Sequence, residues 1–140
     1  MVQERMTRMF AKLPYSQWIE SLGLPIYRGH HVEDLRTVDL DWWEQMGVNA
    51  GFLQLFGMEG ISEGRIVEIP SGKSSKVIKP SLGEIVYVLS GQGLASVWSG
   101  EGPKINFEWQ AHAMFHIPRH ASYQLSNARG DQPARLLHYS

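Results

Sequence analysis

Histidines carry the most obvious metal or acid–base chemistry in this sequence, and His112, His116 and His120 are spaced four residues apart. Neutral imidazole is a common transition-metal ligand and a frequent acid or base near neutral pH. On an extended strand, residues four apart share a face but lie about 13 Å from each other, so His112 and His116 cannot share an ion. His116 and His120 flank a proline-containing corner and could meet there with His138. These three histidines are the only candidate metal site among the histidines. We expect instead that they lie on the surface or form hydrogen bonds.

Other chemistries are excluded by missing residues and motifs. The chain has no cysteine, so disulfides, thiolate zinc sites, thiol nucleophiles and iron–sulfur clusters cannot form. The stretch Ser71-Gly72-Lys73-Ser74 resembles a phosphate-binding loop only superficially, because its leading glycine and following helix are missing. No Gly-x-Ser-x-Gly nucleophile elbow is present either.

Length, composition and charge indicate one globular domain. The 140 residues are 43% hydrophobic and 19% charged, enough for a core without covalent staples. The net charge of −1 and the lack of clustered Lys and Arg argue against a nucleic-acid partner. No apolar run approaches the roughly 20 residues that cross a bilayer, and charges interrupt residues 1–13 where a signal peptide would be apolar. We therefore predict a cytoplasmic protein that binds neither nucleic acid nor membrane.

The elements that would position these side chains divide the chain into two parts. Residues 1–48 are predicted to form a helical or irregular leader. Apolar residues recur at helical spacing over 2–13, and a second helix is expected over 15–22, bracketed by prolines and a glycine. A further turn or two of helix is expected over 41–47. We expect the leader to pack on the outer face of the following barrel or to cover one of its ends.

From residue 49 onward the apolar period changes to that of strands. Turns rich in Gly, Pro and Ser separate short strand-like segments at intervals of about ten residues, a pattern typical of an antiparallel sandwich or barrel. We predict an all-β barrel over 49–140. The expected strands are 51–57, 63–69, 84–89, 94–99, 104–109, 112–117, 121–127 and 133–139.

Two segments of this region resemble the conserved motifs of the cupin superfamily. The first leads through Gly72 to the string Gly-Glu-Ile-Val-Tyr-Val-Leu-Ser-Gly-Gln-Gly at 83–93. The second is Phe-His-Ile-Pro at 115–118, followed by Tyr123 and Asn127. The resemblance covers roughly residues 60 to 139. It implies a cupin-type antiparallel β-barrel, or jelly roll, with a short helical N-terminal leader.

The same resemblance implies where a metal would be held. Cupins use two histidines and a glutamate from the first motif and one histidine from the second. Those positions fall on Ile78, Pro80, Glu84 and Tyr123, so only the glutamate remains. One carboxylate cannot hold iron, manganese or zinc tightly. We predict no metal ligand, no catalytic residue and no cofactor, with iron held elsewhere as the alternative.

These positions also outline a predicted ligand pocket in the barrel lumen, made of Glu84, Tyr123, Leu125 and Ile78. A carboxylate there must be paired, hydrogen-bonded or protonated, and Lys79 or Tyr123 could be its partner. Two interpretations stay open for Glu84. It is a glutamate at the barrel mouth in contact with water, or a pocket carboxylate that binds a polar ligand or acts as acid or base.

A weaker resemblance concerns the leader. The string Leu-Pro-Ile-Tyr-Arg-Gly-His-His-Val-Glu-Asp-Leu at 24–35 resembles the opening of bacterial bicupins related to gentisate-type ring-cleaving dioxygenases. In those proteins a second barrel follows the first, so this chain would be half of such an architecture or a single-barrel relative.

Three functions follow from these observations. The first is a non-catalytic small-molecule-binding or assembly module with a degenerate metal site. The alternative is an Fe(II)-dependent cupin of dioxygenase lineage acting on a hydroxylated aromatic acid, with its metal elsewhere or in a second barrel. The third is metal-free acid–base catalysis by Glu84 and Tyr123. Because Trp42 and Trp43 are adjacent and cannot both bury against one surface, we expect one to anchor the leader and the other to meet the partner of a homodimer.

Overall fold

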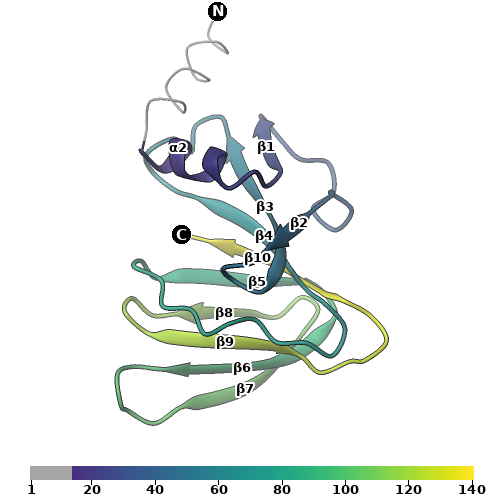
Figure 1. The fold of residues 1–140 in the computed structure, drawn as a ribbon, viewed down its shortest axis with the longest axis vertical. Coiled ribbons are helices and arrows are strands. Elements are labelled where there is room, and N and C mark those ends of the chain that lie inside the picture. The colour runs from purple at the N-terminus through teal and green to yellow at the C-terminus, as the bar shows by residue number, and fades with distance from the viewer. Residues whose placement is uncertain (1–13) are drawn as a thin grey trace, which may run out of the picture.

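The computed structural model describes residues 14–140, and strands make up most of their regular structure (Figure 1). No helix among these residues is long and apolar enough to span a membrane. The elements are α2 (Pro14–Ser21), β1 (Ile26–Gly29), β2 (Asp41–Trp43), β3 (Val48–Leu55), β4 (Gly64–Ile69), β5 (Glu84–Ser90), β6 (Gln92–Trp98), β7 (Ile105–Gln110), β8 (Met114–Ile117), β9 (Ser122–Asn127) and β10 (Ala134–Tyr139).

Two sheets form the body of the protein. The larger has the strand order β1-β3-β4-β10-β5-β8 with β2 also paired to β3, and the smaller has the order β7-β6-β9. Every pairing is antiparallel except that of β1 with β3. All eight strands predicted for the second part of the chain are present, with ends shifted by a few residues. The predicted all-β barrel is therefore confirmed.

The main core fills the space between the two sheets. Buried and less buried residues alternate along β9, so Tyr123, Leu125 and Asn127 point inward while the residues between them are more exposed. Val86 and Val88 of β5 face them from the larger sheet and are fully buried. This period of two is what a half-buried strand requires, and it is the pattern from which the strands were predicted.

The leader closes one end of the barrel. Ile19 of α2 and Leu24 form a second core with Trp43, Ala50 and Phe52, on the same face of β3 that lines the main core. Figure 1 shows α2 and β1 at one end of the molecule and the β6–β7 hairpin at the other. The helix expected over 15–22 is confirmed. The leader was expected on the outer face of the barrel or over one of its ends, and this helix lies over an end. The helix expected over 2–13 lies outside the described residues.

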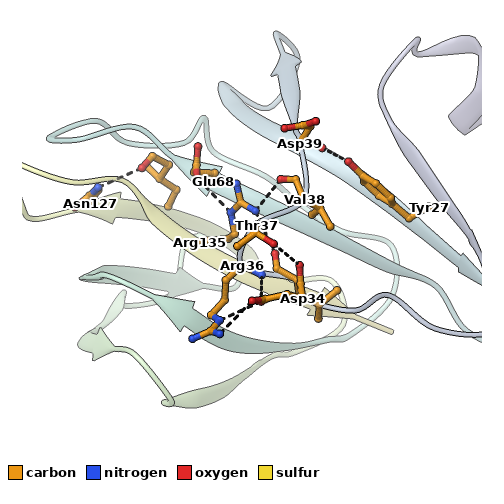
Figure 2. A network of polar contacts seen from close by, with 11 residues as sticks. Tyr27, Asp34, Arg36, Thr37, Val38, Asp39, Glu68, Asn127 and Arg135 are labelled. Atoms are coloured by element: carbon orange, nitrogen blue, oxygen red, sulfur yellow. Dashed lines mark hydrogen bonds and ion pairs between the residues drawn. The ribbon is translucent and has the colours of Figure 1, made fainter.

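The loop between β1 and β2 backs the outer face of the larger sheet (Figure 2). Arg135 of β10 donates from Nη1 to the carbonyl oxygens of Leu35 at 3.1 Å and Val38 at 2.9 Å. Its other nitrogens bind Glu68 Oε1 at 3.0 and 3.2 Å. Gly51 makes room for this loop, because a Cβ there would lie 2.9 Å from the Leu40 side chain.

The prediction of a helical turn over 41–47 is wrong. Residues 41–43 are strand β2, paired with Val48–Ala50 of β3, and Gly47 closes the connecting turn with a φ of +68°. Seven residues are too few to sustain a helix alone, and adjacent tryptophans favour a strand once a partner is present. One of the two adjacent tryptophans was expected to anchor the leader, and Trp43 does so, because it is buried in the second core. Trp42 is half exposed. A partner contact for Trp42 stays a prediction.

Strand β1 was not predicted from the sequence either. Its residues run parallel to β3, with Ile26 opposite Phe52 and Gly29 opposite Leu55. The leader therefore contributes two strands to the larger sheet and is not only helical or irregular. The domain boundary predicted between 48 and 49 falls at the first residue of β3 and stays a prediction.

Candidate functional site

The pocket positions predicted from the sequence converge at the end of the lumen that α2 covers. Glu84 begins β5 and is 3% exposed, and Tyr123 of β9 is also buried. Ile78 bridges to Tyr123 through paired backbone hydrogen bonds of 2.8 and 2.9 Å, which brings the loop before β5 against β9. Leu125 lies one inward position further along β9. The four residues share one region as predicted, and their role in ligand binding stays a prediction.

Arg65 of β4 is the partner of Glu84, a contact not predicted from the sequence. Its Nη1 lies 2.7 Å from Glu84 Oε2, and its Nη2 donates to Glu84 Oε1 at 3.1 Å. The same Nη2 donates to the Tyr123 hydroxyl at 3.2 Å. Glu84 is thus 3% exposed and paired with a cation, and Arg65 takes the role proposed for Lys79 or Tyr123. The sequence spacing could have predicted this position. Arg65 is two and four residues before the inward-facing Val67 and Ile69, so its side chain lies on the same face of the strand.

His138 of β10 completes the cluster and was not predicted to belong to it. It is 1% exposed, and its ring stacks on Tyr123 with centroids 6.1 Å apart. Its Nδ1 lies 3.5 Å from both Glu84 Oε2 and Arg65 Nη2. Cross-strand pairing explains the arrangement, because His138 is opposite Arg65 on one side and Val86 on the other. We call Arg65, Glu84, Tyr123 and His138 the lumen cluster.

The charges of the lumen cluster are fixed at neutral pH. Burial would raise the pKa of Glu84, but hydrogen bonding to His138 and the charge of Arg65 outweigh burial and lower it to about 2. Burial raises the pKa of Tyr123 to about 12, even though Arg65 opposes the rise. Burial, with the nearby Arg65, lowers the pKa of His138, and Glu84 only partly offsets this. The cluster therefore holds one positive and one negative charge, a neutral phenol and a neutral imidazole.

The residues of the lumen do not fit a divalent metal. Ile78 and Pro80 offer no donor atom, Tyr123 keeps its proton, and the Glu84 carboxylate is already bound by a guanidinium. A metal ion there would also meet the fixed positive charge of Arg65. Within residues 14–140, no three or more His, Cys, Asp or Glu side chains are grouped so that they could hold a metal ion.

The alternative histidine set is not brought together. His116 is exposed and lies opposite Ile85 on the outer face of the sheet, whereas His138 is buried in the lumen. His112 and His120 lie in the turns on either side of β8, both with positive φ, and His112 Nδ1 is 3.0 Å from the Tyr87 hydroxyl.

A cleft leads from the surface to the lumen cluster. It has a volume of about 210 Å³ and lies between α2 and the barrel mouth, with Arg65 and Glu84 among its lining residues. Its walls are mostly apolar and include Trp18, Trp43, Met46, Phe52, Ile78 and Leu82. Beyond it lies a small chamber of about 10 Å³, also lined by Trp43, Met46, Arg65 and Ile78 and further by Tyr123 and His138. We call these two spaces the mouth cleft and the inner chamber.

Comparison with solved structures identifies the architecture. A scan against protein-family profiles and a search of curated proteins found no match to this sequence. The structure is similar to the cupin domain of Schizosaccharomyces pombe Cnp3, with 21% identity, a TM-score of 0.59, and coverage of 76% of this chain and 69% of that chain. It is also similar to the Drosophila melanogaster CENP-C cupin domain, with 13% identity, a TM-score of 0.62, and coverage of 78% and 75%. The fold is a cupin fold.

Oxalate decarboxylases share this cupin fold. A formate complex of the Lactobacillus farciminis enzyme is 19% identical with a TM-score of 0.62, and the Bacillus subtilis enzyme at pH 4.6 is 21% identical with a TM-score of 0.60. The Bacillus subtilis enzyme has Mn(II) centres. The match covers 75% of this chain in each case but only 31% and 28% of the enzymes. At these identities the likeness shows the fold alone.

Proposed function

We propose that this cupin is a non-catalytic, small-molecule-binding module that works without a metal. The observation that carries the proposal is the ion pair between Arg65 and Glu84 in the lumen. In a metal-binding cupin, the positive charge beside this glutamate is the metal ion. Here the guanidinium of Arg65 supplies that positive charge. The mouth cleft supplies a concave, largely apolar surface beside that pair, as small-molecule sites commonly do.

Acid–base catalysis by Glu84 and Tyr123 has little physical basis in this arrangement. An effective general acid or base has a pKa close to the working pH. The pKa of Glu84 is lowered to about 2 and that of Tyr123 is raised to about 12, so neither exchanges its proton readily near neutrality. Both side chains are instead held in hydrogen bonds to Arg65.

The dioxygenase alternative requires a metal outside this lumen. The resemblance of residues 24–35 to gentisate-type bicupins is its support, and a second barrel or a partner chain would have to supply the iron. The likeness to oxalate decarboxylases does not favour it, because fold does not determine chemistry. A cytoplasmic location, and the lack of nucleic-acid and membrane partners, likewise remain predictions from the sequence.

The binding proposal is tested by titrating single-ring organic fragments while recording the indole N–H signals of the tryptophans by NMR, with EDTA present throughout. Trp18 and Trp43 line the mouth cleft, whereas Trp98 and Trp109 do not and serve as internal controls. We expect at least one fragment to move the Trp18 and Trp43 signals alone. Fragments that never move these two signals, or that move them only in a parallel titration without EDTA, would contradict the proposal.

Assembly is the second candidate function, because apolar side chains are exposed on the outer face of β5, β8 and the end of β10. Ile85 and Tyr139 are each 45% exposed and lie opposite one another, and Met114 on the edge strand β8 is 68% exposed. β8 ends the larger sheet, so its outer edge has unpaired backbone groups. A second copy packed against this face about a two-fold axis would cover these side chains. We therefore propose a homodimer through this face.

Light scattering on the eluting protein tests the homodimer. We expect the wild type to elute as a dimer and Met114→Glu to elute as a folded monomer. Ile105→Glu is the matched control, since Ile105 is 65% exposed on the smaller sheet. A monomeric wild type, or a dimer that survives Met114→Glu, would show that this face is not the interface.

A further inference from the structure

Two buried ring nitrogens, on side chains that line the inner chamber, have no hydrogen-bond partner among the described residues. They are Nε1 of Trp43, which is 5% exposed, and Nε2 of His138. Both side chains line the inner chamber. A buried donor or acceptor without a partner is unfavourable, so each of these atoms favours a molecule that reaches it.

The surrounding hydrogen bonds assign the tautomer of His138. The two hydrogens of Arg65 Nη2 are directed to Glu84 Oε1 and to the Tyr123 hydroxyl. Arg65 Nη2 also lies 3.5 Å from His138 Nδ1 but has no third hydrogen to donate there, whereas Glu84 Oε2, at the same distance, can accept a further bond. The imidazole is neutral because its pKa is lowered, so its single proton is on Nδ1, toward the carboxylate. Nε2 is then an acceptor, whereas Trp43 Nε1 is a donor.

A hydroxyl group matches this pair of atoms. It accepts from Trp43 and donates to His138 through the same oxygen. A carbonyl could satisfy only the tryptophan, and an ammonium only the histidine. The ligand should also be neutral, because Arg65 and Glu84 already neutralise each other and a further buried charge would have no counter-charge.

The two spaces set the size of the ligand. The inner chamber, at about 10 Å³, takes a single oxygen-sized group. The mouth cleft, at about 210 Å³, has room for one ring, since an apolar cavity of about 150 Å³ accommodates benzene. The cleft walls of Trp18, Phe52 and Met46 offer apolar contact to such a ring.

We propose that the mouth cleft and the inner chamber form one site for a neutral, single-ring phenol or alcohol. Its hydroxyl enters the chamber, accepts from Trp43 Nε1–H and donates to His138 Nε2, while its ring lies in the cleft. This inference rests on the proposed binding function and adds the ligand class. It differs from the hydroxylated aromatic acid of the dioxygenase alternative, because a carboxylate would add an uncompensated negative charge beside Glu84.

The test compares three probes of similar size: 4-methylphenol, 4-methylanisole, which can accept but not donate, and toluene, which can do neither. Calorimetry or NMR titration should show 4-methylphenol binding at least ten-fold more tightly than the other two. Trp43→Phe and His138→Phe should each remove this preference while the ring still binds. Trp109→Phe is the matched control, because Trp109 Nε1 is also buried without a partner but lies away from the site.

The outcomes separate the two proposals. Equal affinities for the three probes, with shifts at Trp18 and Trp43, would overturn the hydroxyl assignment and leave small-molecule binding intact. A preference for 4-methylphenol that survives Trp43→Phe would also overturn it. Should either variant fail to fold, the wild-type protein still decides, because the Trp43 indole proton must shift more with 4-methylphenol than with toluene. Failure of every fragment to reach the mouth cleft would refute both proposals.

Discussion

At the scale of single residues, the permanent charge of Arg65 organises the lumen. The guanidinium holds Glu84 through two of its nitrogens and Tyr123 through one, and all of these side chains are largely withdrawn from water. A buried ion pair need not add stability over apolar residues of the same size, but removing one partner leaves an uncompensated charge. The lumen should therefore tolerate the loss of both charges better than the loss of one.

This asymmetry gives the first prediction. Arg65→Met should lower the free energy of unfolding by about 3–5 kcal/mol, because it strands the Glu84 carboxylate in the core. The double variant Arg65→Met, Glu84→Met should recover most of that loss. Urea denaturation measures both. Arg129→Met, which breaks the exposed pair with Asp131, is the control and should leave stability unchanged. A double variant as unstable as Arg65→Met alone would count against the charge argument.

The second prediction concerns pH. The pKa of Glu84 is lowered from 4.5 to about 2 in the folded state, so its contribution is complete above about pH 4.5 and is lost as the pH falls toward 2. That shift corresponds to about 3 kcal/mol. The lowered pKa of His138 acts in the same direction from about pH 6.5 downward, since the unfolded chain takes up the proton first. Chemical denaturation at a series of pH values should show both losses.

Variants separate the two groups. Glu84→Gln should flatten the fall between about pH 4.5 and 2, and His138→Phe should flatten the part that begins near pH 6.5. Stability profiles of the variants that run parallel to that of the wild type would contradict the assigned pKa shifts.

The sequence identified half of the lumen cluster. Glu84 and Tyr123 belong to segments that resemble family motifs, so both positions could be assigned to the lumen from the order of residues alone. Arg65 and His138 lie on β4 and β10, outside both motifs, and come together only because the two strands are neighbours in the sheet. The alternation of residues along each strand indicated that both side chains point into the barrel. It did not indicate that the two strands are neighbours in the sheet.

At the scale of elements, the leader closes the barrel mouth and backs the larger sheet. α2 and β2 contribute the second core, and the loop from β1 to β2 lies over the outer face, held by Arg135 (Figure 2). Local periodicity predicted α2 correctly. It could not predict β1 or β2, because both are short and depend on pairing with β3. Long-range pairing overrode the local preference of residues 41–47.

The third prediction follows from that attachment. Arg135→Met should lower the free energy of unfolding by about 2–4 kcal/mol. Removing this largely buried guanidinium leaves two carbonyl oxygens and the Glu68 carboxylate without their hydrogen-bond donor. Hydrogen exchange should also quicken over residues 30–40. Arg36→Met is the control, because Arg36 binds only the exposed Asp34 of its own loop in the described contacts. Equal effects of the two variants would mean that Arg135 does not hold the loop.

At the scale of the whole molecule, the barrel is a cupin fold whose mouth is covered by its own leader. The fold was predictable because short strand-like segments recur at intervals of about ten residues with turns between them, and two of these segments resemble cupin motifs. Solved structures of only 13–21% identity share the fold. The function was less predictable, because it depends on which side chains occupy the lumen. A resident arginine in place of metal-binding histidines is the feature on which the account depends.

Metal content tests that claim most directly. Tag-free protein should be incubated anaerobically with Fe(II), Mn(II) and Zn(II) in turn, desalted, and measured by elemental mass spectrometry. We predict less than about a tenth of an equivalent of each metal, because the lumen offers one carboxylate already bound by Arg65. Close to one equivalent of a single metal, lost on substitution of Glu84 or His138, would contradict the account and show that the lumen is a metal site.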